Sequence, residues 1–407
     1  MPTSVDSLPT ALLRPGEADR VLAGHPWIYA GSVLRFTAPV VDGAIVQIKD
    51  HRQRFLGIGC FNSRSKIQIR WLAAERMAID QAFFEQRIRA ALAVRQRHMP
   101  GATSFRVLNA ESDLVSGVIV DKYEDVLVLQ ISSLGMDQRK AAIVAALQAV
   151  LAPRSIVERS EVASRKFEGL EPAGGLLAGE PVETVVARLN GLEFEVDLRG
   201  GHKTGLYLDQ QVNHQRVADM IARLPQPRVL DAFAFVGGFG LHAARAGAAQ
   251  VHLLDQSEEA IAAARRHAER NGLADRCTFE PTNVFDWLKA RTTTAPHEKL
   301  IAPFDAIVLD PPSFTRNRAA VPDALRGYKE IHLRALKLLK PGGLLATFCC
   351  SHHVDAVTFQ DVLLAAAYDA RRIVRRVAVF GQSPDHPVLP SIPETEYLKG
   401  YAVEIVS

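Results

Sequence analysis

The sequence predicts an α/β protein of three blocks: a small N-terminal β domain, a central α+β domain and a C-terminal domain built on a parallel sheet. Two observations support this fold class. Short apolar runs bounded by Gly, Asp, Asn and Ser dominate the first block, as in small β domains. From about residue 213 onward, near-continuous apolar strands alternate with helical patterns, as in parallel sheets covered on both faces. We place the domains at residues 1–75, 76–197 and 198–407.

The first two blocks contain mostly short strands. The runs FLGIGCF and KIQIRWL are typical strands of the first block, and residues 77–99 have the apolar spacing of a connecting helix. In the central block, residues 115–133 predict a β-hairpin and residues 136–151 an amphipathic helix. Asn190-Gly191 predicts a second hairpin, because this pair favours the left-handed backbone of tight turns.

The C-terminal block alternates strands and helices along its length. We expect the strand GGLLATFCC to follow a turn at KPGG and to end beside the strand FDAIVLD. The other strands are expected at residues 228–235, 250–255, 277–285, 371–380 and 398–406. The helices are expected at residues 240–247, 257–273, 287–291, 328–339 and 357–370.

Composition and charge narrow the functional classes. A net charge of +3 permits a nucleic-acid partner without requiring one. No apolar run reaches the roughly 18 residues that span a bilayer, so we expect no membrane partner. The start lacks the basic-then-apolar order of a signal peptide. With four cysteines, of which only two lie close together, the chain carries no disulfide framework, and we expect a reducing, cytoplasmic setting.

Polar and small residues stand where the predicted strands end, and ligands of open α/β sheets bind at this edge. Gly237 and Gly238 follow the first strand and let the backbone approach a ligand at a helix N-terminus. Asp255 ends the next strand, at a spacing from Asp231 that suits a carboxylate bonded to ribose hydroxyls. Residues 283–286 stand at the end of the third strand and combine polar and apolar groups suited to an adenine edge. The sequence therefore predicts a nucleoside site, although the loop is not G-x-G-x-x-G.

The motif DPPSF, residues 310–314, follows the fourth strand. Pro311 and Pro312 stiffen the loop and leave fixed carbonyl acceptors, because proline has no N–H donor. Asp310 can bond a ring nitrogen or an exocyclic amine, and Phe314 can stack on a planar base. A rigid loop alone would explain the prolines, but not the carboxylate and the phenyl group that flank them.

These motifs together resemble those of the class I S-adenosylmethionine (SAM)-dependent methyltransferases, which have a Rossmann-like domain. More narrowly, the chain resembles the bacterial large-subunit rRNA cytosine-C5 methyltransferase I family along almost its whole length. The segment LRPGEADRVLAGHPWIYAGSV resembles that family's N-terminal PUA domain, which binds RNA. Further similar signatures are NAESDLVSGVIVDKY, HKTGLYLDQQVNH and DHPVLPSIPETEYLKGY.

The resemblance implies SAM as cofactor and large-subunit rRNA as substrate, with a homodimer as the protein assembly to test. It implies cofactor contacts from Asp231, Phe233, Gly237, Gly238, Phe239, Asp255, Gln256, Asn283, Val284 and Asp310. It implies substrate contacts from Pro311, Pro312, Phe314, Lys203, Arg20 and Trp27, and no metal site. The chain departs from the family pattern at three places. The family often has Tyr-Thr where this chain has Phe235-Val236, and it commonly has Arg at the position of Gln211. The family also commonly has an acidic residue near the position of Asn283.

Cys349 and Cys350 are adjacent, and several roles are open to them. A disulfide between neighbours would be strained, and the spacing to His352 and His353 is not that of a structural zinc site. Small apolar filler suits Cys349 better, because successive strand residues face opposite ways. The resemblance places a catalytic thiol immediately before Ser351, which makes Cys350 the expected nucleophile toward cytosine C6. Asp310 is its expected partner, and the base that removes the C5 proton is not identified.

Aromatic and basic residues of the first block fit RNA binding, as stacking and phosphate contacts require. Besides Arg20 and Trp27 they are Tyr29, Arg54, Arg64, Lys66 and Arg70, and Arg159, Arg165 and Lys166 of the second block are candidates for the same role. Scattered surface charges around a core tryptophan would look similar. Two rival functions stay open: an RNA exocyclic-amine methyltransferase that needs no thiol, and a non-catalytic RNA-binding assembly factor.

Overall fold

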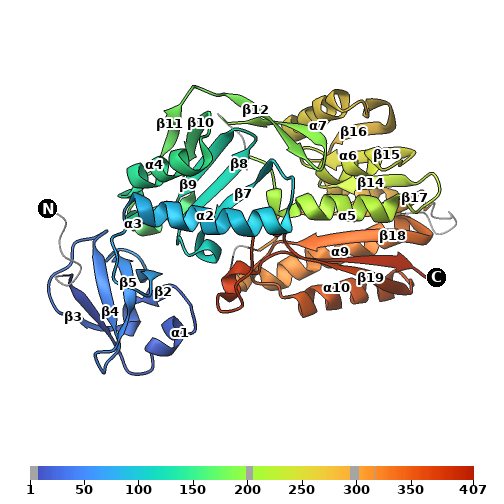
Figure 1. The fold of residues 1–407 in the computed structure, drawn as a ribbon. Coiled ribbons are helices and arrows are strands. Elements are labelled where there is room, and N and C mark those ends of the chain that lie inside the picture. The colour runs from blue at the N-terminus through green and yellow to red at the C-terminus, as the bar shows by residue number, and fades with distance from the viewer. Residues whose placement is uncertain (1–7, 199–204, 294–301, 316) are drawn as a thin grey trace. The chain divides into compact units, whose positions relative to one another are not determined.

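A computed structural model of the chain describes residues 8–198, 205–293, 302–315 and 317–407 (Figure 1). The chain forms two compact units. The first contains Met1–Leu189, Val196–Leu208 and Pro384–Thr395, and the second contains Asn190–Glu195, Asp209–Ser383 and Glu396–Ser407. The boundary expected near residue 75 falls inside the first unit and stays a prediction.

In the described part of the first unit, the N-terminal residues form a six-stranded sheet in the order β2-β6-β5-β4-β1-β3. Its strands are β1 (Thr10–Leu13), β2 (Trp27–Tyr29), β3 (Val33–Phe36), β4 (Ile45–Lys49), β5 (Phe55–Phe61) and β6 (Ile67–Ala73), with the short helix α1 (Ala18–Leu22). Apolar residues of these strands, Ile28 among them, form one core with Ala18 and Val21 of α1. The predicted small β domain is therefore confirmed.

The next residues of the same unit form a sheet in the order β11-β10-β9-β8-β7, against which helices α2 and α4 pack in a shared core. Helix α2 begins at Gln81, later than expected, because the Asp80 side chain caps it by accepting from Phe83 N. The strands are β7 (Ser104–Asn109), β8 (Val118–Tyr123), β9 (Val126–Ile131), β10 (Ser155–Arg159) and β11 (Gly174–Gly179). The helices are α2 (Gln81–His98), α3 (Leu134–Asp137) and α4 (Lys140–Leu151).

Both predicted hairpins are present. β8 and β9 pair antiparallel around residues 124–125, as the sequence predicts. β12 (Thr184–Leu189) and β13 (Leu192–Asp197) form the second hairpin, with Asn190 and Gly191 at φ values of 50° and 85° in its turn. A two-residue turn needs these left-handed conformations, which Asn and Gly adopt at low cost.

The described residues of the second unit form a seven-stranded sheet in the order β16-β15-β14-β17-β18-β20-β19. Helices α6 and α7 pack on β14–β16, and α5 lies beside α6 (Figure 1). Helices α8, α9 and α10 share a second core with β17, β18 and β20. The strands are β14 (Arg228–Ala232), β15 (Gln250–Asp255), β16 (Cys277–Pro281), β17 (Phe304–Leu309), β18 (Leu339–Cys349), β19 (Val374–Phe380) and β20 (Lys399–Ile405). The helices are α5 (Gln211–Ile221), α6 (Gly238–Arg245), α7 (Glu258–Arg270), α8 (Val284–Thr292), α9 (Val321–Leu338) and α10 (Ala356–Asp369).

Two details of this sheet correct the sequence-based expectations. The sheet is not wholly parallel, because β20 runs antiparallel to both β18 and β19. Strand β18 already begins at Leu339 and contains KPGG, where its register against β17 shifts, and it ends at Cys349. Cys350 is thus the first residue after the strand. Among the described helices, none combines the length and apolarity needed to cross a bilayer.

Candidate functional site

The predicted site loops meet at one edge of the second unit's sheet. Ala232, the last residue of β14, pairs with Leu254 of β15 on one side and with Leu309 of β17 on the other. Leu309 in turn pairs with Thr347 of β18. The residues that follow these strands therefore leave the sheet side by side, as expected for a ligand site in an open α/β fold.

The loop after β14 has an unusual backbone. Phe233 and Phe235 adopt positive φ values of 69° and 48°, and Gly237 follows at 92° as the N-cap of α6. Left-handed conformations cost free energy in residues with a Cβ, and they concentrate at functional sites. Asp255 helps to hold this shape, because its Oδ2 accepts from Phe235 N at 2.9 Å.

Asp231 supports the same loop from inside the fold. Its side chain is buried, and its Oδ2 accepts from Gly240 N at 2.6 Å. Burial raises the pKa of Asp231 to about 7, against the effect of the Gly240 hydrogen bond. Its Oδ1 is buried and has no hydrogen-bond partner among the described residues, an exception that calls for a bound group or water.

The loops after β15 and β16 hold the next candidates. Asp255 is half-buried and its Oδ1 accepts from Ser257 N at 2.9 Å, while Gln256 is exposed. Asn283 caps α8, with its Oδ1 2.9 Å from Phe285 N. Val284 lies in the apolar core, so its side chain is packing. The side-chain oxygen of Asn283 thus already accepts a hydrogen bond from the helix backbone, and the NH2 group of its side chain is what remains for a ligand.

Asp310, the first residue after β17, lies near carboxyl and amide groups. Gln210 Nε2 donates to Asp310 Oδ1 at 3.1 Å, and Gln210 Oε1 accepts from Asn213 Nδ2 at 2.7 Å. Removal from water raises the pKa of Asp310 to about 8. The nearby carboxyl groups of Asp209 and Asp231 raise it further, while the Gln210 hydrogen bond opposes them.

Asp209 and Gln210 were missed as site residues. Both directly precede α5. Gln210 is 100 residues away from Asp310 in the sequence, although the two side chains are in contact. Asp209 Oδ2 accepts from the Tyr397 hydroxyl at 2.7 Å, and its buried Oδ1 has no partner among the described residues. The signal available in the sequence was the dense polar run LDQQVNH at the start of a helix.

The DPPSF loop is tied to the residues after β18. Ser313 Oγ lies 2.8 Å from Ser351 Oγ and donates to Thr315 O at 2.8 Å. The Phe314 ring packs at 4.6 Å from Tyr328, centroid to centroid, and Phe233 and Phe285 lie near it. The loop that carries Asp310 and the segment that carries Cys350 are therefore held together.

The two adjacent cysteines differ in environment. Cys349 is fully buried in the apolar core, which confirms its interpretation as packing. Cys350 is half-buried and lies outside the strand. All four cysteines of the chain are described, and none forms a disulfide. His352 and His353, which follow, are exposed.

Lys399 is a further residue that sequence reasoning missed. It pairs with Cys349 across β18 and β20, and its Nζ donates to Ser351 O and Val354 O, both at 2.6 Å. Burial lowers the pKa of Lys399, while the thiols of Cys349 and Cys350 act to raise it. A cation thus lies within electrostatic reach of the expected nucleophile.

The remaining predicted substrate residues stay predictions. Arg20 and Trp27 belong to the first unit, and Lys203 lies outside the described residues. The Arg20 guanidinium is 3.4 Å from Glu394, and Trp27 Nε1 donates to Glu111 at 2.9 Å.

Two arginines expected to face RNA are instead used inside the first unit. Arg165 is buried and donates to Ile131 O and Asp137. Arg70 is largely buried and pairs with Glu168 at 2.8 Å. For these two guanidinium groups the expectation was wrong, because their charges are neutralised within the fold.

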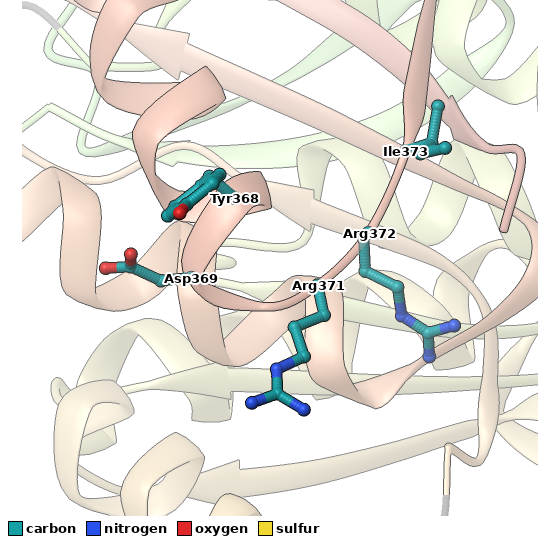
Figure 2. A pocket seen from close by; sticks show the side chains of 5 residues that line it. All are labelled: Tyr368, Asp369, Arg371, Arg372 and Ile373. Atoms are coloured by element: carbon teal, nitrogen blue, oxygen red, sulfur yellow. The ribbon is translucent and has the colours of Figure 1, made fainter.

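A surface pocket of about 520 Å³ lies elsewhere on the second unit. Figure 2 shows its lining, which consists of Tyr368, Asp369, Arg371, Arg372 and Ile373 between α10 and β19. Val374, which follows the pocket residues, begins β19 and pairs with Ile405 of β20. The preceding residue of β20, Glu404, pairs with Leu344 near the amino end of β18. The pocket therefore lies at the opposite edge of the sheet from the candidate site.

Comparison with known proteins gives strong matches. A family model described as S-adenosylmethionine-dependent methyltransferase matches residues 159–392, and a PUA-like domain model matches residues 12–74. Ribosomal RNA large subunit methyltransferase I of Klebsiella pneumoniae (strain 342) is 39% identical over 407 residues, covering 98% of this chain and 100% of that protein. The protein of the same name from Shewanella amazonensis is 39% identical over 399 residues, covering 97% and 98%.

Solved structures share the fold. A protein assigned as a methyltransferase, in complex with S-adenosylhomocysteine (SAH), superposes with a TM-score of 0.80 at 20% identity, covering 97% of this chain and 99% of that one. A Streptococcus mutans protein that is assigned as a SAM-dependent methyltransferase superposes with a TM-score of 0.79, at the same identity and coverage. With the family models, they identify the six-stranded sheet as part of a PUA-like domain and the seven-stranded sheet as that of a Rossmann-like methyltransferase domain.

Proposed function

We propose, on the premise that this chain belongs to the ribosomal RNA large subunit methyltransferase I family of SAM-dependent enzymes, that it forms 5-methylcytosine in large-subunit rRNA through a covalent bond from Cys350 to the base. One observation carries the proposal: the half-buried Cys350 directly follows β18, and Asp310 directly follows β17, the strand with which β18 pairs. A thiol and a neutral carboxyl group at neighbouring strand ends are what this chemistry requires.

The residues of the β14 and β15 loops fit the family's methyl donor. SAM supplies an electrophilic methyl group when bound. In the proposed arrangement, the strained loop at Phe233–Gly238 lets the backbone approach the donor, and Asp255 holds ribose hydroxyls. The buried Oδ1 of Asp231, which lacks a partner among the described residues, is a polar atom that a bound group at this loop would satisfy.

Cys350 supplies the nucleophile, because cytosine C5 alone is a weak one. The thiolate Sγ forms a bond to C6, and the electron pair of the C5–C6 double bond makes C5 able to accept a methyl group. That pair would form the bond from C5 to the methyl group supplied by SAM, while the sulfur of the donor would keep the electrons of its broken bond to the methyl group and SAH would leave. Loss of the C5 proton to a base then returns the C5–H electrons to the ring. The Sγ–C6 bond breaks at the same stage, and the thiolate leaves.

Asp310 orients the cytosine through a neutral carboxyl group. With a pKa of about 8, its carboxyl group is protonated at neutral pH. It can then donate its proton to N3 and accept a hydrogen bond from the N4 amine, a pattern that matches cytosine on both atoms. Donation to N3 also stabilises the charge that develops there as Sγ adds to C6.

Lys399 keeps the thiol reactive in this account, because a nearby cation favours the thiolate. We expect Lys399→Met to slow alkylation of Cys350 by iodoacetamide at pH 7.5 by about threefold to tenfold, since loss of an opposite charge reduces the thiolate fraction. Peptide mass spectrometry of the alkylated protein measures this rate at Cys350. Lys399→Arg keeps the charge and should keep most of the rate; an equal loss in both variants would contradict the electrostatic role.

RNA contact in the first unit is proposed at Phe167, whose side chain is 74% exposed. Its neighbours hold it outward: Glu168 is buried and accepts from Ser65 Oγ at 2.6 Å, and Arg165 is buried as well. Lys166 is exposed beside it, and the Arg64 side chain lies against Gly169. An exposed aromatic ring among cations in a rigid frame is suited to base stacking and phosphate contacts.

We expect Phe167→Ala to weaken binding of a large-subunit rRNA fragment by about tenfold, since one stacked base contributes about 1–3 kcal/mol. Fluorescence anisotropy measures the affinity. Phe167→Tyr keeps the ring and should bind like the wild type. Tyr368→Ala, at an exposed aromatic residue of the second unit's pocket, is the matched control. Equal weakening by Phe167→Ala and Tyr368→Ala would contradict a specific role for Phe167.

The test of the proposed function is to map methyl groups by mass spectrometry in rRNA from cells with and without this protein. The proposal predicts that one 5-methylcytosine of large-subunit rRNA disappears with the protein and returns when the gene is restored. A methyl group lost from an exocyclic amine instead would overturn the reaction type. Assembly as a homodimer and a cytoplasmic location remain parts of the proposal, which light scattering and cell fractionation check.

A further inference from the structure

The loop that we assign to the methyl donor is contacted by two buried histidines, His242 of α6 and His267 of α7. Both rings also contact the segment Asn190–Glu195, which belongs to the second unit although it is distant in sequence. Each histidine therefore connects the segment to the loop.

The ring of His267 has a defined hydrogen-bonding state. Glu195 N lies 3.0 Å from His267 Nε2, and because a backbone N–H can only donate, Nε2 must accept. Nδ1 therefore carries the proton, which it donates to Val236 O at 3.1 Å. The ring fits this position only as the neutral Nδ1–H tautomer. Burial lowers the pKa of His267, in keeping with a neutral ring.

His242 is held in the same way. Its Nδ1 lies 2.7 Å from Gly238 O, so Nδ1 donates to this carbonyl. Its Nε2 lies 3.1 Å from Asn190 Nδ2. The orientation of the Asn190 amide is set by Gln211 O, which accepts from Nδ2 at 2.7 Å. Nε2 of His242 therefore accepts, and this ring is also the Nδ1–H tautomer.

We propose that His242 and His267, together with Asn190 and the backbone of Glu195, form a brace that positions the methyl-donor loop. The brace holds the carbonyls of Val236 and Gly238, which flank Gly237 on both sides. It thereby sets the direction of the peptide groups at the N-terminus of α6. The two histidines are positioning residues, since they act through the loop.

The backbone of the loop shows why a brace is needed. Phe233 and Phe235 hold left-handed conformations that cost free energy, and such conformations persist only where the surroundings over-determine them. Asp255 restrains the loop from the sheet side through Phe235 N. The brace restrains Val236 and Gly238, which follow directly, so the two sets of contacts together fix the loop before a ligand arrives.

A third histidine makes the fit at this point tight. A Cβ at Gly238 would lie 2.6 Å from His214, whose ring packs at 4.5 Å from Phe239, centroid to centroid. Gly238 is therefore required by the rings around it as well as by the ligand expected in front of it.

The test is the affinity for SAH, measured by calorimetry on the full chain. We expect His267→Ala to raise the Kd for SAH by about tenfold, the equivalent of roughly one hydrogen bond's contribution to the loop conformation. His267→Asn should recover most of the affinity, because its amide nitrogen occupies nearly the position of Nδ1 and can donate to Val236 O. His332→Ala is the matched control, as His332 is equally buried but bonds Thr347 instead of the loop.

The outcomes separate the brace from a merely structural role. If His267→Ala lowers the melting temperature as much as His332→Ala does and leaves the Kd for SAH unchanged, the brace is overturned. Nitrogen-15 NMR of the wild-type protein is the independent readout, and an Nε2–H tautomer at His242 or His267 would overturn it too. The inference rests on the proposed function of the loop, which Asp255→Ala tests separately: unchanged SAH binding there would refute the loop assignment itself.

Discussion

Replacing Cys350 with Ala is expected to lower the rate of methyl transfer to rRNA by at least about a thousandfold, because C5 is not activated without addition at C6. SAH binding should stay at the wild-type level, since no cofactor contact is proposed for the thiol. The rate is measured with radiolabelled SAM and large-subunit rRNA. Cys350→Ser should be nearly as inactive, because a hydroxyl group is a far weaker nucleophile than a thiolate at neutral pH.

Cys349→Ala is the matched control for the loss of a neighbouring sulfur. Cys349 is fully buried in the core, so this variant should lose some stability and keep most of its activity. Activity that survives intact in Cys350→Ala would refute the covalent mechanism and favour methylation of an exocyclic amine at the DPPSF loop. Loss of SAH binding in Cys350→Ala would show that the variant is misfolded, which the melting temperature also reports.

Replacing Asp310 with Asn should lower kcat by about a hundredfold while KM for RNA changes little, since the amide keeps both hydrogen bonds to cytosine but cannot transfer a proton. The pH profile carries the sharper expectation. The pKa of Asp310 is raised to about 8, so the carboxyl group holds its proton below that pH and loses it above. Wild-type activity should therefore fall as the pH rises through about 8.

The alkaline fall should be absent in Asp310→Asn, because the amide does not titrate. Asp305→Asn is the control at the other end of the same strand, where Asp305 pairs with Lys340 at 2.8 Å. This variant should keep the wild-type profile. An alkaline fall that persists unchanged in Asp310→Asn would assign it to another group and contradict the proposed neutral carboxyl.

The part of the site that follows the strands could be predicted from the sequence. Asp255, Asp310 and Cys350 each come directly after an apolar run, or within one residue of its end, and parallel strands bring such ends to one edge of the sheet. The roles assigned to these residues stay predictions. What the pattern does predict is that they lie at one edge of the sheet, and the parallel pairing of β15, β14, β17 and β18 places their strand ends along that edge.

The supporting residues could not be predicted because their contacts are set by tertiary packing. Gln210 reaches Asp310 from a distant segment, and Lys399 reaches Ser351 only because β20 turns back antiparallel beside β18. Tertiary packing also explains why Arg70 and Arg165 were wrongly expected to contact RNA, since each pairs with a carboxylate inside the fold. Charge is visible in a sequence, but the buried carboxylate that neutralises it, such as Glu168, is not.

The most direct measurement is to incubate the protein and SAM with an rRNA fragment that carries 5-fluorocytidine. Fluorine at C5 cannot leave as a proton does, so a protein–RNA adduct formed at C6 is trapped after methyl transfer. We predict a denaturation-resistant adduct whose peptide map places the nucleotide on Cys350 and which is absent in Cys350→Ala. Methylation of the unmodified RNA without any trapped adduct, or an adduct on another residue, would contradict the account.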